Sequence, residues 1–156
     1  MRATVVLPSP VDRVFATVCD FSTYRAWLDG IEEARLVSGT IPAQYEFYFR
    51  YTGRYLIISS RDVAVRVQGG ARGNGASGCE WSEVAGRVPE RRGIVRMPLF
   101  RGSWSIEPVD GGRSRVVYQA AVRPGGSIPD GMVRSNAVSE LRDVIERLRR
   151  RLAENR

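Results

Sequence analysis

Aromatic side chains occupy every second position of the stretch Tyr45-Glu46-Phe47-Tyr48-Phe49-Arg50-Tyr51, and the charged Glu46 and Arg50 lie between them. Because side chains alternate between the two faces of a β-strand, this stretch predicts a strand with one aromatic face and one polar face. Antiparallel sheets commonly bury one face and leave the other in water. The stretch therefore indicates an antiparallel sheet that is wet outside and apolar inside.

The same period of two continues along most of the chain that follows, and Gly, Pro and Asn turns interrupt it. The pattern predicts strands at Glu33–Val37, Tyr45–Tyr51, Leu56–Gln68, Cys79–Val84, Ile94–Met97, Ser103–Glu107 and Arg115–Val122. We therefore expect an antiparallel meander of about seven strands. The glycine-rich connector 69–78 matches no phosphate-binding fingerprint, because no helix follows it, and we expect a flexible turn there.

Two short helices are expected after a first strand at Thr4–Leu7. Ser9 is a plausible N-cap, Pro10 suits the first helical position, and Asp12 completes a capping box. Apolar residues then recur at helical spacing as far as Cys19-Asp20. A second short helix is predicted across Ser22–Leu28, with Gly30 as its stop.

The end of the chain predicts one long amphipathic helix of about five turns or more. Its apolar positions are spaced by three and four residues, and they are Met132, Val133, Ala137, Leu141, Val144, Ile145, Leu148 and Leu152. No linker or composition break divides residues 1–156, so we expect a single domain. The fold class is α+β, with a curved antiparallel sheet wrapped on this helix.

A cavity is expected between the sheet and the helix. A large sheet curls because its strands twist, and one helix covers only part of its concave side. Small inward residues such as Ala120 leave further room, so we expect a site for an apolar ligand, although each residue alone could simply fill a core. The expected lining residues are Tyr45, Phe47, Phe49, Tyr51, Val63, Val65, Val67, Trp81, Val95, Met97, Trp104, Ile106, Tyr118, Ala120, Val133, Ala137 and Leu141.

The residue inventory excludes much catalytic chemistry. The chain has no histidine, and all 24 basic residues are arginine. The commonest general base and metal ligand are therefore missing, and so is any lysine for a Schiff base. Cys19 and Cys79 form no CxxC pair, so we expect no disulfide framework and no zinc site, and we expect Cys19 to be a small buried hydrophobe. These features favour a protein that is not an enzyme and needs no metal or cofactor.

The net charge and the hydropathy of the chain indicate which partners and which cellular compartment to expect. The net charge is +7, but the arginines are spread through the predicted strands, loops and last helix, so nucleic-acid binding is not expected. Transient contact with an anionic membrane is compatible with this charge. No stretch is long and apolar enough for a membrane span or a secretory signal, and two isolated cysteines fit a reducing compartment. We expect a cytoplasmic protein as the chain is written, or an exported one if the chain is a shortened form of a precursor.

Five motifs together resemble the START lipid-transfer domains, within the helix-grip superfamily that also contains polyketide aromatase/cyclases. They are Asp20–Leu28, Arg61–Arg66, Val88–Arg96, Gly102–Pro108 and Pro124–Pro129. None is diagnostic alone, but their order and spacing are fairly specific. The resemblance implies a helix-grip fold that binds a sterol, phospholipid or other hydrophobe without covalent chemistry.

The resemblance also implies particular roles. The loop around Gly86–Arg92 and the long C-terminal helix would act as a lid. Arg61 would meet a polar group of the ligand, or a buried carboxylate, near the cavity wall, and the alternative is an ordinary ion pair with Glu46, Asp62 or Glu83.

Three functions are compatible with these patterns. The first is binding of a hydrophobic small molecule or lipid in the cavity, with or without its transfer. The second is a polyketide cyclase or aromatase, in which Arg61, Tyr45, Tyr51 or Tyr118 would orient a polyketone. The third is a module that binds a partner protein through an exposed apolar patch.

Overall fold

The elements of the chain follow the expected order of a strand, two short helices, a run of strands and one long helix. The computed structural model describes residues 1–53 and 59–154. The elements are β1 (Arg2–Leu7), α1 (Val11–Val18), the 3-10 helix η1 (Phe21–Ala26), β2 (Ile31–Thr40), β3 (Gln44–Tyr51), β4 (Arg61–Gly73), β5 (Ala76–Glu83), β6 (Val95–Arg96), β7 (Leu99–Val109), η2 (Asp110–Gly112), β8 (Arg113–Arg123) and α2 (Asp130–Glu154).

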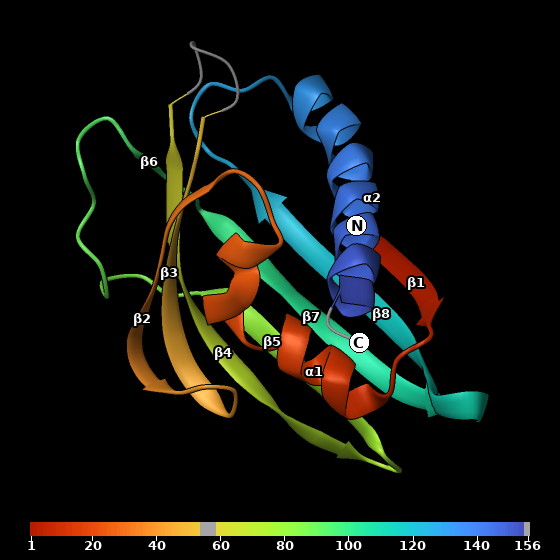
Figure 1. Cartoon of the computed structure of the whole chain (residues 1–156). Coiled ribbons are helices and arrows are strands. Elements are labelled where there is room, and N and C mark those ends of the chain that lie inside the picture. Colours follow the sequence, from red (N-terminus) through yellow and green to blue (C-terminus); the bar gives the residue numbers. More distant parts are fainter. Residues whose placement is uncertain (54–58, 155–156) are drawn as a thin grey trace.

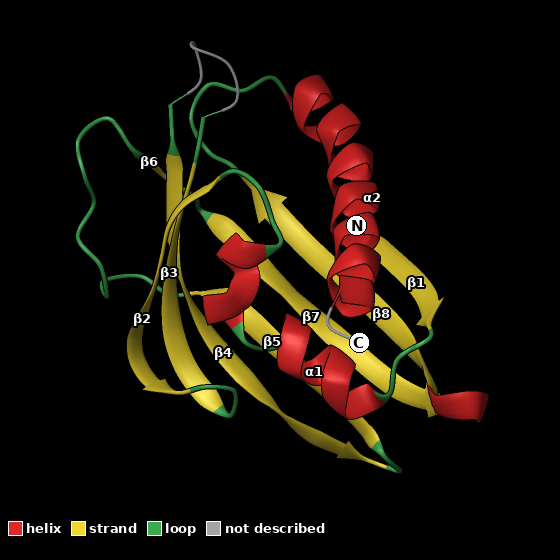
Figure 2. Ribbon diagram, viewed as in Figure 1, coloured by secondary structure: helices red, strands yellow, loops and turns green. Residues whose placement is uncertain are grey.

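One sheet carries all eight strands found in the described residues. Its order is β1-β8-β7-β5-β4-β3-β2, and the short β6 pairs in parallel with the start of β4. All other pairs are antiparallel. The sheet curves, and α1, η1 and α2 all lie on its concave side (Figures 1 and 2). The expected α+β helix-grip architecture is confirmed.

The β4–β5 hairpin is longer than the sequence pattern predicts. The ladder runs through the glycines, from Gly69 paired with Cys79 to Gly73 paired with Ala76. Only Asn74 and Gly75 form the turn, with φ angles of 53° and 76°, as a two-residue hairpin turn requires. The prediction of a flexible turn across 69–78 is wrong, because ladder hydrogen bonds join backbone groups and need no side chains. Residues 56–58 of the predicted strand Leu56–Gln68 lie outside the described residues.

The first residues of the two short helices also differ from those that the sequence predicted. Helix α1 begins at Val11 after Pro10, and no side chain caps it. The prediction of Ser9 as the N-cap is wrong, because Ser9 is buried against β8, where its carbonyl accepts a 2.6 Å hydrogen bond from the Ser114 hydroxyl. The second helix is the shorter 3-10 helix η1, whose first turn is capped by the Asp20 carboxylate.

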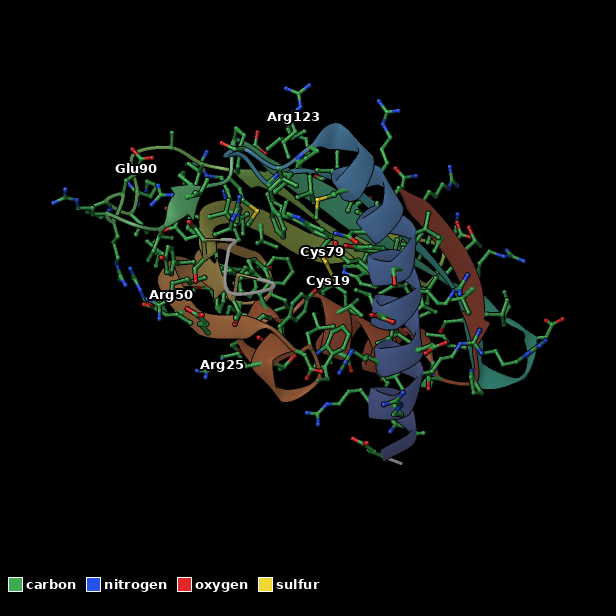
Figure 3. All side chains as sticks on the ribbon, turned by 90° about the horizontal axis from the view of Figure 1, so that it is seen from above. Cys19, Arg25, Arg50, Cys79, Glu90 and Arg123 are labelled. Carbon is green, nitrogen blue, oxygen red and sulfur yellow. A yellow bond between two sulfur atoms is a disulfide. The ribbon has the colours of Figure 1, made fainter. Side chains whose placement is uncertain are left out.

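Cys19 and Cys79 are joined by a disulfide at the centre of the packed core (Figure 3). Their Cα atoms lie 5.8 Å apart, although 60 residues separate them in sequence. Both residues are almost fully buried. The expectation of two separate thiols in a reducing compartment is therefore wrong on the first point, because α1 lies across β5 in space and sequence spacing carries no information about that contact.

Part of the outer face of the sheet is covered. Val88, in the segment between β5 and β6, packs on Tyr48 and Ala64. Beside them Asp62 is buried, accepting 2.7 Å hydrogen bonds from the Tyr48 hydroxyl and from Arg96 Nε. The prediction of a uniformly wet outer face is wrong here. Strand alternation assigns a residue to a face but does not reveal which loop later covers that face.

Candidate ligand-binding cavity

A cavity of about 570 Å³ lies between α2 and the concave side of the sheet. Its wall comes from η1 and the segment after it, from residues of β3, β4, β5, β7 and β8, and from α2 between Met132 and Arg147. Pockets that hold small molecules commonly measure roughly 300–1,000 Å³ and are mostly apolar. The cavity lies between the sheet and the long helix, where the sequence predicted a space. Its use as a ligand site stays a prediction.

Ten of the predicted site residues line this cavity. They are Phe49, Tyr51, Arg61, Trp81, Met97, Trp104, Tyr118, Val133, Ala137 and Leu141. They come from β3, β4, β5, β7, β8 and α2 and from the residue after β6. Alternation along the strands and helical spacing along α2 thus identified part of the side chains that converge on this space.

The other predicted residues do not line it. Tyr45, Phe47, Val63, Val65, Val67 and Ile106 belong to the packed core. The Phe21 ring of η1 lies 5.9 Å from the Tyr45 ring and 6.2 Å from the Phe47 ring, between centroids, so η1 fills the space in front of β3. Val95 lies under the turn at Gly125 and Gly126. Ala120 is buried opposite Gly102, a position over which the Trp81 ring lies.

Sequence reasoning missed the contribution of η1 to the wall. Phe21, Tyr24, Trp27 and Leu28 all line the cavity. The apolar side of this helix was visible in the sequence, but nothing local indicated that it would face α2 across an open space. Phe100, Val122, Ile128 and Glu140 also line the cavity and were not predicted.

Tyrosine hydroxyls in the interior differ in their partners. The Tyr24 hydroxyl donates a 2.6 Å hydrogen bond to the Val18 carbonyl and accepts one of 3.1 Å from Trp104 Nε1. The hydroxyls of Tyr51 and Tyr118 have no hydrogen-bond partner among the described residues, and both side chains line the cavity. Trp27 Nε1 is also buried without a partner in that part of the chain.

Burial raises the pKa of both cavity tyrosines well above the usual value. The negative charge of Glu140, on α2, contributes to this effect at both residues. Tyr51 and Tyr118 are therefore neutral near pH 7, where their hydroxyls can donate or accept hydrogen bonds but are poor proton donors for catalysis.

Arg61 is buried at the wall and binds backbone oxygens. Its guanidinium donates to the carbonyls of Ser59, Pro124 and Gly125, and burial lowers its pKa. The expected ion-pair partners are engaged elsewhere: Glu46 with Arg66 and Arg87, Asp62 with Arg96, and Glu83 with Arg101. Arg61 thus joins the start of β4 to the turn that precedes α2.

The loop around Gly86–Arg92 lies away from the cavity. Arg87 binds Glu46, and Arg91 lies 3.3 Å from Glu33, both on the outer side of the sheet. Figure 1 shows this segment on the far side of β3 and β4 from α2. None of its residues lines the cavity. The lid role that the resemblance implied for this loop does not fit the arrangement, whereas α2 does cover the cavity.

Within the part of the chain that the structure describes, no group of three metal-binding side chains comes together. In the same residues, no helix has the length and apolarity needed to cross a membrane.

Comparison with known proteins identifies the class. Residues 1–153 match the family described as "Polyketide cyclase / dehydrase and lipid transport", and the chain belongs to that family. Within the class, the fold is that of START domains, as the sequence motifs indicated. A STAR-related lipid transfer protein from Xanthomonas axonopodis (fragment 25–204) is 27% identical, with a TM-score of 0.85 over 97% of this chain and 84% of that chain.

Two more distant structures show the range of this fold. Human StAR-related lipid transfer protein 5 is 15% identical, with a TM-score of 0.88 over 98% of this chain and 74% of that chain. The di-domain ARO/CYC StfQ from the steffimycin biosynthetic pathway is 13% identical, with a TM-score of 0.63 over 95% of this chain and 42% of that chain. An uncharacterized protein of Pseudomonas aeruginosa, PA1579, is 29% identical over 92 residues, which are 59% of this chain but only 46% of that protein.

Proposed function

We propose that the protein binds one hydrophobic small molecule or lipid, non-covalently, in the cavity beneath α2. The apolar cavity itself carries this proposal, because its wall is built from side chains such as Phe49, Trp104 and Leu141. Burying about 300 Å² of apolar ligand surface contributes roughly 7–8 kcal/mol at ~25 cal/mol/Å² before ordering costs, which is compatible with micromolar affinity.

Transfer of the ligand between membranes is the second part of the proposal. The family description, which includes lipid transport, supports it. The net charge of +7 suits transient contact with an anionic membrane. Arginines labelled in Figure 3, such as Arg25 and Arg123, lie at the periphery of the molecule.

A cyclase activity is the alternative. It is favoured by the cyclase part of the family description and by the unpaired hydroxyls of Tyr51 and Tyr118, which could polarise a ketone of a bound polyketone. Incubation with a poly-β-ketone thioester analogue separates the two functions. Cyclised product formed at a rate that Tyr51→Phe or Tyr118→Phe reduces would favour the enzyme, whereas unchanged analogue in the bound fraction would favour the binding protein.

The test of binding is titration with the fluorophore N-phenyl-1-naphthylamine, with native mass spectrometry to give the stoichiometry. We expect saturable one-to-one binding, weakened at least tenfold by Leu141→Arg, because an unpaired charge in an apolar wall is costly. Val138→Arg is the matched control, since Val138 is on the same helix but 62% exposed. Absence of saturable binding by the folded parent protein would overturn the proposal.

We also propose that the protein works in an oxidising compartment, in place of the cytoplasmic location expected from the sequence. The Cys19–Cys79 disulfide supports this proposal, because such bonds persist mainly in secreted or periplasmic proteins. Acid-quenched thiol alkylation of the protein in its own host cells is the test. Two alkylated cysteines per chain, without added reductant, would contradict it.

A further inference from the structure

Arg61 is a buried positive charge in the wall of the cavity. It is only 8% exposed, and it lines the space beneath α2. It forms no ion pair with the described residues, because the nearby carboxylates of Glu46, Asp62 and Glu83 bind other arginines. Burial is also the one cause that shifts its pKa, to which no acidic group contributes. A buried charge without a counter-charge is costly, so a negative partner is expected at this position.

The backbone carbonyls around Arg61 satisfy part of the guanidinium without neutralising it. Nε donates to the carbonyl of Pro124, Nη1 to that of Ser59 and Nη2 to that of Gly125. A guanidinium has five N–H donors, so one N–H on each of Nη1 and Nη2 has no acceptor in the part of the chain that is described. Because arginine stays protonated in proteins, these two groups can still donate charge-assisted hydrogen bonds.

The turn that follows β8 keeps side-chain atoms away from the end of the guanidinium. Gly125 and Gly126 have φ angles of 75° and 71°, a left-handed conformation that favours glycine. A Cβ atom at position 126 would lie 2.9 Å from Arg61 Nη2, which is too close for a side chain. Glycine at this position therefore leaves the nitrogen that has a spare N–H uncrowded.

The other charged residues of the described cavity wall do not supply the missing counter-charge. Arg147 and Asp29 are paired with each other, at 2.5 Å. Asp143 is exposed to water, and Glu140 has a contact of its own. None of these three carboxylates contributes to the pKa of Arg61. A negative ligand group beside Arg61 would therefore meet an opposite charge, and the carboxylates of the wall would lie farther away.

We infer that the ligand is an acidic amphiphile, whose carboxylate or phosphate group binds the guanidinium of Arg61. Its anionic oxygens accept the two remaining N–H groups. Its hydrocarbon part extends along the apolar wall formed by residues such as Phe49, Trp104 and Leu141. This inference rests on the proposed function and narrows its ligand class to hydrophobic molecules with one negatively charged end.

Displacement of the bound fluorophore by compounds with the same chain and different head groups tests the inference. Dodecanoate, dodecyl phosphate, dodecanol and dodecylamine are compared at neutral pH, below their aggregation limits. We expect at least one of the two acids to displace the fluorophore at about tenfold lower concentration than dodecanol, the size expected of a hydrogen bond to a charged group. The acid that binds more tightly identifies the head group.

Three variants assign this preference to a residue. Arg61→Met should remove the preference for the acid over dodecanol, whereas Arg61→Lys keeps the positive charge and should keep most of it. Arg147→Met is the matched control and should behave as the parent does, because Arg147 lines the same cavity but is paired with Asp29. Thermal unfolding establishes that each variant is folded at the temperature of the titration. Equal losses in Arg61→Lys and Arg61→Met would show that the positive charge does not recognise the head group.

A second measurement uses the parent protein alone. NMR titration of the bound acid, followed at its carboxyl carbon or its phosphorus, gives the pKa of the head group. An adjacent guanidinium lowers this pKa, whereas an apolar cavity without a counter-charge raises it. We therefore expect the pKa of the bound acid to lie below that of the same acid free in water.

The possible failures of the inference and of the proposed function are distinct. A head-group pKa above the value in water, a preference for dodecanol or dodecylamine, or an unchanged preference in Arg61→Met would overturn the inference while binding of the fluorophore still stood. Absence of saturable fluorophore binding would instead overturn the proposed function, and this inference with it.

Discussion

Tyrosines at the two ends of the concave side of the sheet have different roles, because one hydroxyl is bonded in the core and the other faces the cavity. Tyr45 and Tyr51 both lie on β3 and point to the same face. The Tyr45 hydroxyl accepts a 3.2 Å hydrogen bond from the Phe21 backbone N–H and donates one of 2.7 Å to the Cys19 carbonyl. The Tyr51 hydroxyl lines the cavity and has no such partner among the described residues. Position along the strand, and not residue type, decides between the two roles.

The difference follows from what covers each end. Helices α1 and η1 pack against the end of the sheet that contains Tyr45, which we call the packed end. The Cys19–Cys79 disulfide joins the end of α1 to β5 there. At the other end α2 crosses the sheet, and the cavity remains beneath it, with η1 forming one side of its wall. The packed end should therefore supply most of the stability, and the open end should supply binding.

The largest effect is expected from removing the disulfide. The double variant Cys19→Ala, Cys79→Ala opens a link across 60 residues, which should cost about 4 kcal/mol on the chain-entropy model and lower the melting temperature by roughly 10 °C. Fluorophore affinity of the folded variant should change little, because neither cysteine lines the cavity. A melting temperature within two or three degrees of the oxidised parent would show that the packed end does not dominate stability.

Two tryptophan substitutions compare a closely packed position on β8 with a position in the cavity. Ala120→Trp adds an indole to a buried position and should cost about 1–3 kcal/mol through strain, lowering the melting temperature by several degrees. Ala137→Trp places the same ring in the cavity, so it should keep the stability of the ligand-free protein while reducing fluorophore binding. If Ala137→Trp proves the more destabilising variant, the cavity is a packed core.

Arg61 lies at the open end of the sheet, where it is paired with Tyr51 across β3 and β4. Arg61→Met removes the bonds to the carbonyls of Ser59, Pro124 and Gly125 and should cost about 1–3 kcal/mol. Because that turn leads into α2, fluorophore binding should weaken as well. Thermal unfolding and titration are measured together, and a loss of stability with unchanged affinity would argue against any role of Arg61 at the ligand.

Removing single hydroxyls should give a smaller difference in stability between the two ends. Tyr45→Phe leaves the Phe21 N–H and the Cys19 carbonyl without their partner and should cost about 1–3 kcal/mol. Tyr51→Phe removes a hydroxyl with no described partner, so the free energy of unfolding should stay the same or rise. Chemical denaturation of the ligand-free proteins is the measurement, and equal losses in both variants would remove the distinction between the ends.

A change of pH between about 6 and 9 is expected to have the smallest effect on ligand affinity. Burial raises the pKa of Tyr51 and Tyr118 above the usual value of about 10. Their contribution to stability is complete below pH ~10 and is lost as pH rises from there through their raised folded pKa values. Affinity for N-phenyl-1-naphthylamine should therefore be constant between about pH 6 and pH 9, and a decline within that range would indicate another titrating group in the cavity wall.

The local pattern of apolar and polar residues was enough to predict the faces of β3 and the long helix α2. Alternation along Tyr45–Tyr51 assigned the faces of β3 correctly, and spacing along the last segment predicted α2 and its apolar side. These predictions succeed because backbone geometry sets the direction of each side chain within its own element. Composition alone likewise excluded histidine and lysine chemistry, because the chain contains neither residue.

Only the tertiary structure decided which apolar residues line a cavity and which fill the core. It also joined Cys19 to Cys79, gave Arg61 backbone partners in place of a carboxylate, and covered Asp62 with a loop that was expected to be a lid. Each of these outcomes depends on contacts between residues far apart in the sequence. Residue pattern indicates which way a side chain points, but the element that arrives in front of it determines whether it is packed, paired or left open to a ligand.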